Sequence, residues 1–148
     1  MARDGFNVTI VGDRRVVRAF DRLPRQADRE LRDGSERLAR QMANRIRASG
    51  RSFSRQAAAA SRTVRVGRGR FPRIVAGPEI RLMGSEFGAR RRFGWFAAAR
   101  YRGGFGQFPA RRAGNPGSWF WPTYRAEQPA IRVAHQQMAA AIVREFEA

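Results

Sequence analysis

Residues 24–49 constrain the fold most, because their pattern predicts one long amphipathic helix. Apolar side chains recur at steps of three and four residues, as they do on one face of an α-helix: Ala27, Leu31, Leu38, Met42 and Ile46. Gly34 and Ser35 interrupt the pattern and weaken the helix locally. Acidic residues crowd the first half and arginines the second. That order complements the helix macrodipole, so this is the best-supported element of the chain.

Shorter elements are expected on both sides of this helix. Residues 6–11, FNVTIV, alternate like a short strand. Asp13 can cap a helix that continues to about Leu23, where Pro24 ends it and suits the first turn of the next. Residues 50–60 are interpreted as a polar linker with an alanine run.

The middle of the chain predicts a small antiparallel sheet. Residues 62–66 and 73–77 read as two strands, and the glycine-containing segment 67–70 as the turn between them. Residues 79–88, EIRLMGSEFG, are interpreted as a third strand that ends in glycine.

The last third of the chain is divided between an irregular segment and a helix. Residues 89–118 show no clean period and many glycines, which suggests a long excursion from the sheet. A final helix is expected over about 126–146, with Pro129 in its first turn or at its start. Its stripe is Ile131, Ala134, Met138, Ile142 and Phe146. The expected architecture is α+β in a single domain, 1–148, in which the C-terminal helix packs back on the rest.

The high positive charge of the chain predicts binding to a polyanion or to an acidic partner. The formal net charge is +18, and all 30 basic residues are arginine. The absence of lysine, with only three asparagines and two tyrosines, is typical of codon bias in a GC-rich genome, so part of the excess is background. The rest still favours attraction to negative partners.

Several classes of function are disfavoured. There is no cysteine for a disulfide or a cysteine-ligated zinc site, no apolar run of membrane-spanning length, and no apolar leader typical of secretion. We therefore expect a protein without a membrane segment that is soluble where it is made. His135 is the only histidine, and no carboxylate falls within 37–78 or 87–126. We predict no enzymatic activity, no cofactor and no metal site.

Aromatic and arginine residues gather in and around the excursion. Residues 87–124 hold 11 of the 16 aromatic residues. The residues predicted to contact a second subunit or a partner are Phe93, Trp95, Phe96, Tyr101, Phe105, Phe108, Trp119, Phe120 and Trp121. Those that could face DNA are Arg90, Arg91, Arg92, Arg100, Arg102, Arg111 and Arg112. Two interpretations stay open: a protein interface rich in aromatics and arginine, or a nucleic-acid-binding segment that pairs phosphates and stacks bases. The first is favoured because large apolar groups on a glycine-rich loop need a lasting cover.

Three segments resemble the tail-completion or head–tail connector (neck) proteins of long-tailed bacteriophages, a family that includes the Z-type minor tail proteins. They are the helix–proline–helix segment 16–49, GSEFG at 84–88, and the segment 119–146 that begins WFWPTYRAE. The second is similar to the family's strand ending in Glu-aromatic-Gly, and the third to its aromatic-Pro entrance into the last helix. Together they cover most of the chain outside 89–118.

The resemblance implies a non-enzymatic structural protein of the virion, made in the host cytoplasm. Such a protein forms a closed ring in the phage neck, most commonly of six copies and possibly of twelve. Its expected partners are the head-closure or connector protein and the tail-tube or tail-terminator protein. DNA would pass through the channel with non-specific contacts to arginines. The alternative function is a standalone basic RNA- or DNA-binding protein that uses arginines and stacked aromatics.

Overall fold

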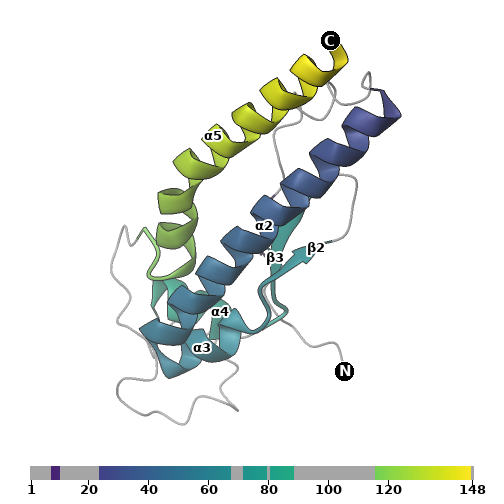
Figure 1. Cartoon of the computed structure of the whole chain (residues 1–148). Coiled ribbons are helices and arrows are strands. Elements are labelled where there is room, and N and C mark those ends of the chain that lie inside the picture. Colours follow the sequence, from purple (N-terminus) through teal and green to yellow (C-terminus); the bar gives the residue numbers. More distant parts are fainter. Residues whose placement is uncertain (1–7, 11–23, 68–71, 80, 89–115, 148) are drawn as a thin grey trace.

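Two long antiparallel helices dominate the structure, a computed structural model that describes residues 8–10, 24–67, 72–79, 81–88 and 116–147. Helix α2 covers Arg25–Phe53 and helix α5 covers Phe120–Glu147. They lie side by side in Figure 1, with the start of α2 and the C-terminus at the same end. The α+β class with a long N-terminal and a C-terminal helix is therefore confirmed. The helix expected over 13–23 lies outside the described residues.

A small antiparallel sheet packs beside α2. Its strands are β1 (Val8–Ile10), β2 (Arg65–Gly67) and β3 (Arg73–Ala76), in the order β1-β3-β2. Strand β3 is central: Ile74 is opposite Ile10 of β1 and Val66 of β2. The predicted strand 6–11 and the predicted hairpin are thus confirmed in shortened form, while residues 68–71 of the turn lie outside the description.

The interpretation of residues 50–60 as a linker is wrong. Helix α2 continues to Phe53, and a further helix, α3, covers Arg55–Ser61. Ser54 ends α2 in an extended conformation, and its Oγ accepts a hydrogen bond from Ala57 N at 3.1 Å. This is an ordinary N-cap arrangement. The alanine run favours a helix and is small enough for Ala57 and Ala60 to be fully buried.

The third strand expected over 79–88 is also wrong, because this segment forms helix α4 (Arg81–Phe87). Short apolar runs do not distinguish a strand from a buried helix. Here the Glu79 side chain accepts from Arg81 N at 3.1 Å at the start of the helix, and Leu82 faces the core. These contacts favour the helix over an edge strand.

Helix α5 begins six residues earlier than the predicted start near 126. Pro129 consequently lies inside the helix and not in its first turn. The early start has a tertiary cause, a carboxylate from α4, which is described in the next subsection.

The structure divides into a body and an arm. The body contains the main core, built from the second half of α2, α3, the sheet, α4 and the start of α5: Met42, Ala43, Ile46, Ala57, Ala60, Val64, Ile74, Ala76, Leu82, Trp119 and Phe120. The arm consists of residues 25–38 of α2 and 134–147 of α5. Its cluster of buried residues is only Ala27, Leu31 and Ile142, with Met138 packed against it.

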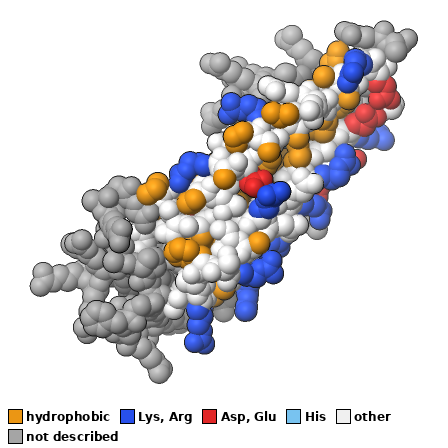
Figure 2. Space-filling model, turned by 60° about the vertical axis from the view of Figure 1, so that its left-hand side comes forward, with side chains coloured by type: hydrophobic (Ala, Val, Ile, Leu, Met, Phe, Trp, Pro, Cys, Tyr) orange, Lys and Arg blue, Asp and Glu red, His pale blue; other side chains and the backbone are white. Residues whose placement is uncertain are grey.

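Part of the predicted stripes is confirmed by this burial. Leu38 and Ala134 are only half-buried, and Ile131 packs against the body core from its edge. Figure 2 views the molecule from the side of α5 and shows hydrophobic side chains that remain exposed along it.

Candidate functional site

The buried carboxylate of Glu86 joins the described residues that precede the segment 89–115 to those that follow it. Glu86 is 2% exposed and lies in the last turn of α4. Its Oε2 accepts hydrogen bonds from the backbone N–H groups of Trp119 (2.9 Å) and Phe120 (2.8 Å). Its Oε1 accepts from the N–H of Trp121 at 2.8 Å.

These three N–H groups belong to the N-terminus of α5, where a helix has no partners of its own for them. A negative charge there also meets the positive end of the helix dipole. Glu86 therefore acts as a capping residue supplied from 33 to 35 residues away in the sequence. This explains why α5 begins at Phe120.

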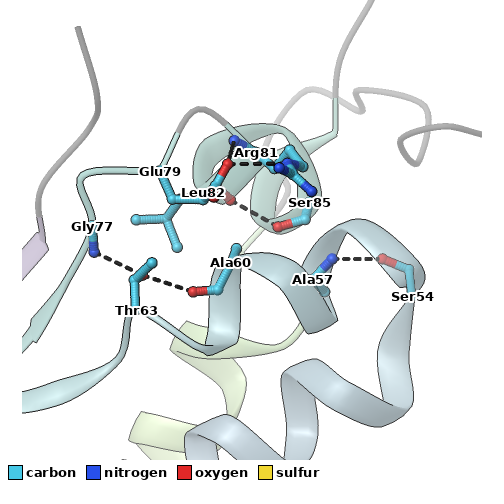
Figure 3. A network of polar contacts seen from close by, with 9 residues as sticks. All are labelled: Ser54, Ala57, Ala60, Thr63, Gly77, Glu79, Arg81, Leu82 and Ser85. Atoms are coloured by element: carbon cyan, nitrogen blue, oxygen red, sulfur yellow. Dashed lines mark hydrogen bonds and ion pairs between the residues drawn. The ribbon is translucent and has the colours of Figure 1, made fainter. Parts of the chain in front are cut away.

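Ser85 adds a second connection between the same two elements. Its Oγ accepts from the Trp119 indole Nε1 at 3.1 Å and donates to the Leu82 carbonyl oxygen at 3.0 Å. Figure 3 shows the Ser85–Leu82 bond within α4, above the bonds that Thr63 makes to Ala60 and Gly77. The indole is thus fully buried with its polar atom satisfied.

Gly117, which follows the segment 89–115, also lies against Glu86. Its φ is +102°, which L side chains rarely adopt, and a Cβ atom there would overlap Glu86 Oε1. Gly88, the last described residue before 89, follows Glu86 by two positions. The described residues on the two sides of the segment 89–115 therefore come together at one carboxylate: Gly117 lies against Glu86, which precedes Gly88 by two positions.

Aromatic rings continue from this base along the first turns of α5. Trp119 and Phe120 meet edge to face at 5.7 Å, Phe120 and Trp121 at 5.5 Å, and Trp121 and Tyr124 at 5.7 Å. Trp121 and Tyr124 are only partly buried, and both pack against the body core. The series passes from the interior to the surface beside the loop.

The structure corrects two of the predicted interface residues. Trp119 is 0% and Phe120 is 2% exposed, so both are core residues and offer no surface to a partner. The reason is the hydrogen bonding of their backbone to Glu86, which turns the start of α5 inward. Trp121 keeps a partly exposed ring. The remaining predicted residues lie outside the described part of the chain: Phe93, Trp95, Phe96, Tyr101, Phe105 and Phe108, and Arg90, Arg91, Arg92, Arg100, Arg102, Arg111 and Arg112.

An exposed apolar face on α5 was missed by the reasoning from sequence. Val133 and Val143 are each 50% exposed and lie among exposed alanines and glutamines. Figure 2 shows exposed hydrophobic side chains along this helix, with charged side chains among them. The signal in the sequence is that both valines fall outside the stripe that contains Met138 and Ile142.

Charge is distributed unevenly along the long axis. Asp28, Glu30, Asp33 and Glu36 lie on the arm portion of α2, opposite Glu145 near the end of α5. The part of α2 in the body carries arginines and no carboxylate. Of those arginines, Arg45 pairs with Glu127 of α5 at 2.9 Å.

His135 lies half-buried on α5, and burial lowers its pKa below the ordinary value. Within the described ranges, no group of three His, Cys, Asp or Glu side chains is placed to hold a metal ion. No helix in the described part of the chain is both long enough and apolar enough to cross a membrane.

Comparison with known proteins adds no relative: no protein-family model, curated protein or solved structure matches the chain significantly. The functional interpretation therefore depends on the geometry of the chain itself.

Proposed function

We propose that the chain is a structural virion protein that forms a closed ring in the neck of a long-tailed bacteriophage. The observation that carries this proposal is the Glu86 cap. It joins two of the three segments that resemble the neck family, 84–88 and 119–146, and closes the loop between them. A cap of this kind needs a carboxylate in the first segment, 84–88, and the start of a helix in the second, 119–146.

The Glu86 cap supports the proposal because the side chains that hold the described fold together are different from those of the segment 89–115. The side chains of that segment can therefore serve to bind a partner. The described core of the body and the α5 cap are built from residues on either side of 89–115. Six aromatic residues and seven arginines in the loop, with no carboxylate, are then available for other tasks. Long loops held on a rigid scaffold commonly carry binding function.

The charge distribution supports a head-to-tail contact. Closed rings use two different patches on each subunit. The arginine-rich segment 89–115 of one subunit is complementary in charge to a groove on the arm of the next, which is lined by Glu30, Asp33 and Glu145, with Arg37, Met138 and Ile142 beside them. The exposed face of α5 around Val133 and Val143 offers a further surface for the connector or tail-tube protein.

The experiment is native mass spectrometry of the purified chain, alone and with its tail-tube and connector partners. We expect rings, with six copies favoured and twelve possible, once a partner is present. A chain that stays monomeric with every neck partner would overturn the proposal.

Two loop variants sharpen this experiment. In the first, the six loop aromatics become serine: Phe93, Trp95, Phe96, Tyr101, Phe105 and Phe108. In the second, the seven loop arginines become glutamine: Arg90, Arg91, Arg92, Arg100, Arg102, Arg111 and Arg112. Because the loop closes at Glu86, we expect both variants to fold. The aromatic variant should lose rings, and the arginine variant should weaken the contact with DNA in the channel.

The alternative function, a standalone nucleic-acid-binding protein, makes the opposite prediction. It expects tight binding to DNA or RNA by the monomer, which the aromatic variant would weaken by about 1–3 kcal/mol for each stacked base. It also expects no dependence on neck partners. A chain that forms no ring with any neck partner, together with single-strand binding that the aromatic variant loses, would favour this alternative.

A further inference from the structure

Three arginines at the corner between α2 and α3 are exposed and have no acidic partner among the residues that the structure describes. Arg51 lies in the last turn of α2, Arg55 begins α3, and Arg62 caps its C-terminus. All three are exposed, and none makes an ion pair or a side-chain hydrogen bond with another residue in the described ranges. We call these arginines, together with Phe53, the basic corner.

The arrangement brings the charges onto one end of the body. Ser54 turns the chain between the helices, so Arg51 and Arg55 flank the turn. Arg55 and Arg62 are seven residues apart, about two turns of a helix, and therefore lie on the same side of α3. Figure 1 shows α3 at the end of α2, away from the acidic end of the arm.

No carboxylate in the described ranges forms an ion pair with the arginines of this corner. The sequence contains none between residues 37 and 78. The other carboxylates of the body are engaged: Glu79 pairs with Arg81, Glu127 pairs with Arg45, and Glu86 is buried under the start of α5. The arginines of the arm, by contrast, include Arg32, which is paired with Asp28.

Phe53 lies between Arg51 and Arg55 in the sequence and is 43% exposed, although a large aromatic ring is normally buried. The segment RSFSR at 51–55 thus carries one exposed ring and two exposed arginines at the end of α2 and the start of α3. A guanidinium fork matches the geometry of a phosphate, and an aromatic face stacks on a base.

We propose that the basic corner binds the phosphate backbone of nucleic acid, with Arg51, Arg55 and Arg62 on phosphates and Phe53 against an exposed base or sugar. This site consists of residues other than those of 89–115, to which DNA contact was assigned from sequence. It does not depend on ring formation, because it would bind nucleic acid on a single subunit.

An acidic protein is the other partner that three arginines could attract. Protein interfaces have an apolar core surrounded by polar groups. The basic corner offers only one exposed large apolar side chain, whereas the broader exposed apolar face lies elsewhere, at Val133 and Val143 of α5. The corner therefore fits a polyanion better than a protein surface.

The test compares two triple variants of the full chain that remove the same charge. The corner variant is Arg51→Gln, Arg55→Gln and Arg62→Gln. The control is Arg25→Gln, Arg29→Gln and Arg132→Gln, which are also exposed arginines without a described ion pair but lie on the other parts of α2 and α5. Far-ultraviolet circular dichroism and thermal unfolding should give wild-type results for both.

Fluorescence anisotropy with a mixed-sequence DNA duplex of about 30 bp measures the affinity over a range of salt concentrations. Three lost phosphate contacts should lower the salt slope by about 2–3 and the affinity by roughly a hundredfold near 0.1 M salt. The control should change the affinity only a few-fold through net charge. An equal loss in both variants, or no loss in the corner variant, would overturn the proposal.

Phe53→Ala tests the aromatic part with single-stranded oligonucleotides. Loss of one stacked base should weaken single-strand binding by roughly five- to a hundredfold and leave duplex binding nearly unchanged. Unchanged single-strand binding would remove Phe53 from the site. If the corner variant keeps its DNA affinity but no longer assembles with neck proteins, the corner is a protein-binding surface and the proposal is wrong.

Discussion

The body and the arm are built from the same two long helices but are held together by different means. In the body, α2 and α5 enclose a core to which α3, α4 and the sheet also contribute, and its largest side chains, Trp119 and Phe120, are fully buried. In the arm, the buried cluster of the described residues comes from α2 and α5 alone. The arm cluster of buried residues consists of Ala27, Leu31 and Ile142.

The difference shows which contacts require particular residues and so determine this fold. Most contacts of the arm can form between any two amphipathic helices of suitable length. The body requires partners that are distant in sequence, above all Glu86 and the backbone of residues 119–121. We therefore expect substitutions in the body to be costly and equivalent substitutions in the arm to be tolerated.

The largest effect is expected for Glu86→Ala. The change leaves three buried N–H groups without their acceptor, and each such group costs about 1–3 kcal/mol. Because water can reach part of the space, we expect a total loss of about 3–5 kcal/mol in the free energy of unfolding, measured by urea denaturation.

Two further variants show whether the effect comes from the cap. Glu86→Gln keeps the shape but has one acceptor oxygen where the carboxylate has two, so an intermediate loss is expected. Glu145→Ala removes an exposed carboxylate from the arm and should change stability by less than about 0.5 kcal/mol. Equal losses for Glu86→Ala and Glu145→Ala would contradict the distinction between body and arm.

Gly50→Ala tests the packing of the body. Gly50 is buried in α2, and a Cβ atom there would lie 2.6 Å from Ser61 Cβ and 2.8 Å from Trp119 Cε3. Neither group can move easily, since the indole is fixed by Ser85. Overpacking of this kind costs about 1–3 kcal/mol, which exceeds the gain of roughly 1 kcal/mol in helix propensity. A shift of the thermal midpoint to lower temperature is expected, and a rise would show that the indole can be displaced.

Gly34→Ala is the matched change in the arm. Gly34 is also buried in α2, but its added Cβ would meet the end of the Met138 side chain, which is flexible. The cost of moving Met138 and the gain in propensity should nearly cancel, within about 1 kcal/mol of the wild type. In a Met138→Ala background the same change should stabilise the protein by about 0.8–1.0 kcal/mol. A large loss in that background would mean that something other than Met138 requires glycine.

The same contrast explains what could be predicted from the sequence. The stripe Ala27, Leu31, Met42 and Ile46 gave α2 correctly, because helical periodicity is a local property. Gly34 was expected to weaken that helix, whereas its place opposite Met138 allows the two helices to approach closely. That reason is visible only once α5 is in position.

The segments read wrongly are those whose conformation depends on distant partners. Residues 81–87 form a helix and α5 begins at Phe120 because Glu86 and the N-terminus of α5 satisfy each other. Trp119 and Phe120 were counted as interface residues for the same reason: nothing near them in the sequence shows that a carboxylate more than 30 residues earlier turns them inward. Residues 50–60, which include Arg51, Phe53 and Arg55 of the basic corner, were read as a linker because Ser54 was not recognised as a cap.

The smallest effect is expected for the pH dependence that His135 adds to the stability. Burial lowers its pKa in the folded chain, so the unfolded chain binds a proton more readily at this site. The contribution of neutral His135 is therefore complete above the unfolded pKa of about 6.5 and is lost as the pH falls below it, towards the lower folded pKa. Urea midpoints of the wild type should fall between about pH 7 and pH 5, and His135→Gln should fall less. Since most carboxylates titrate below this range, parallel curves for the two proteins would show that His135 is as well hydrated in the folded chain as in the unfolded one.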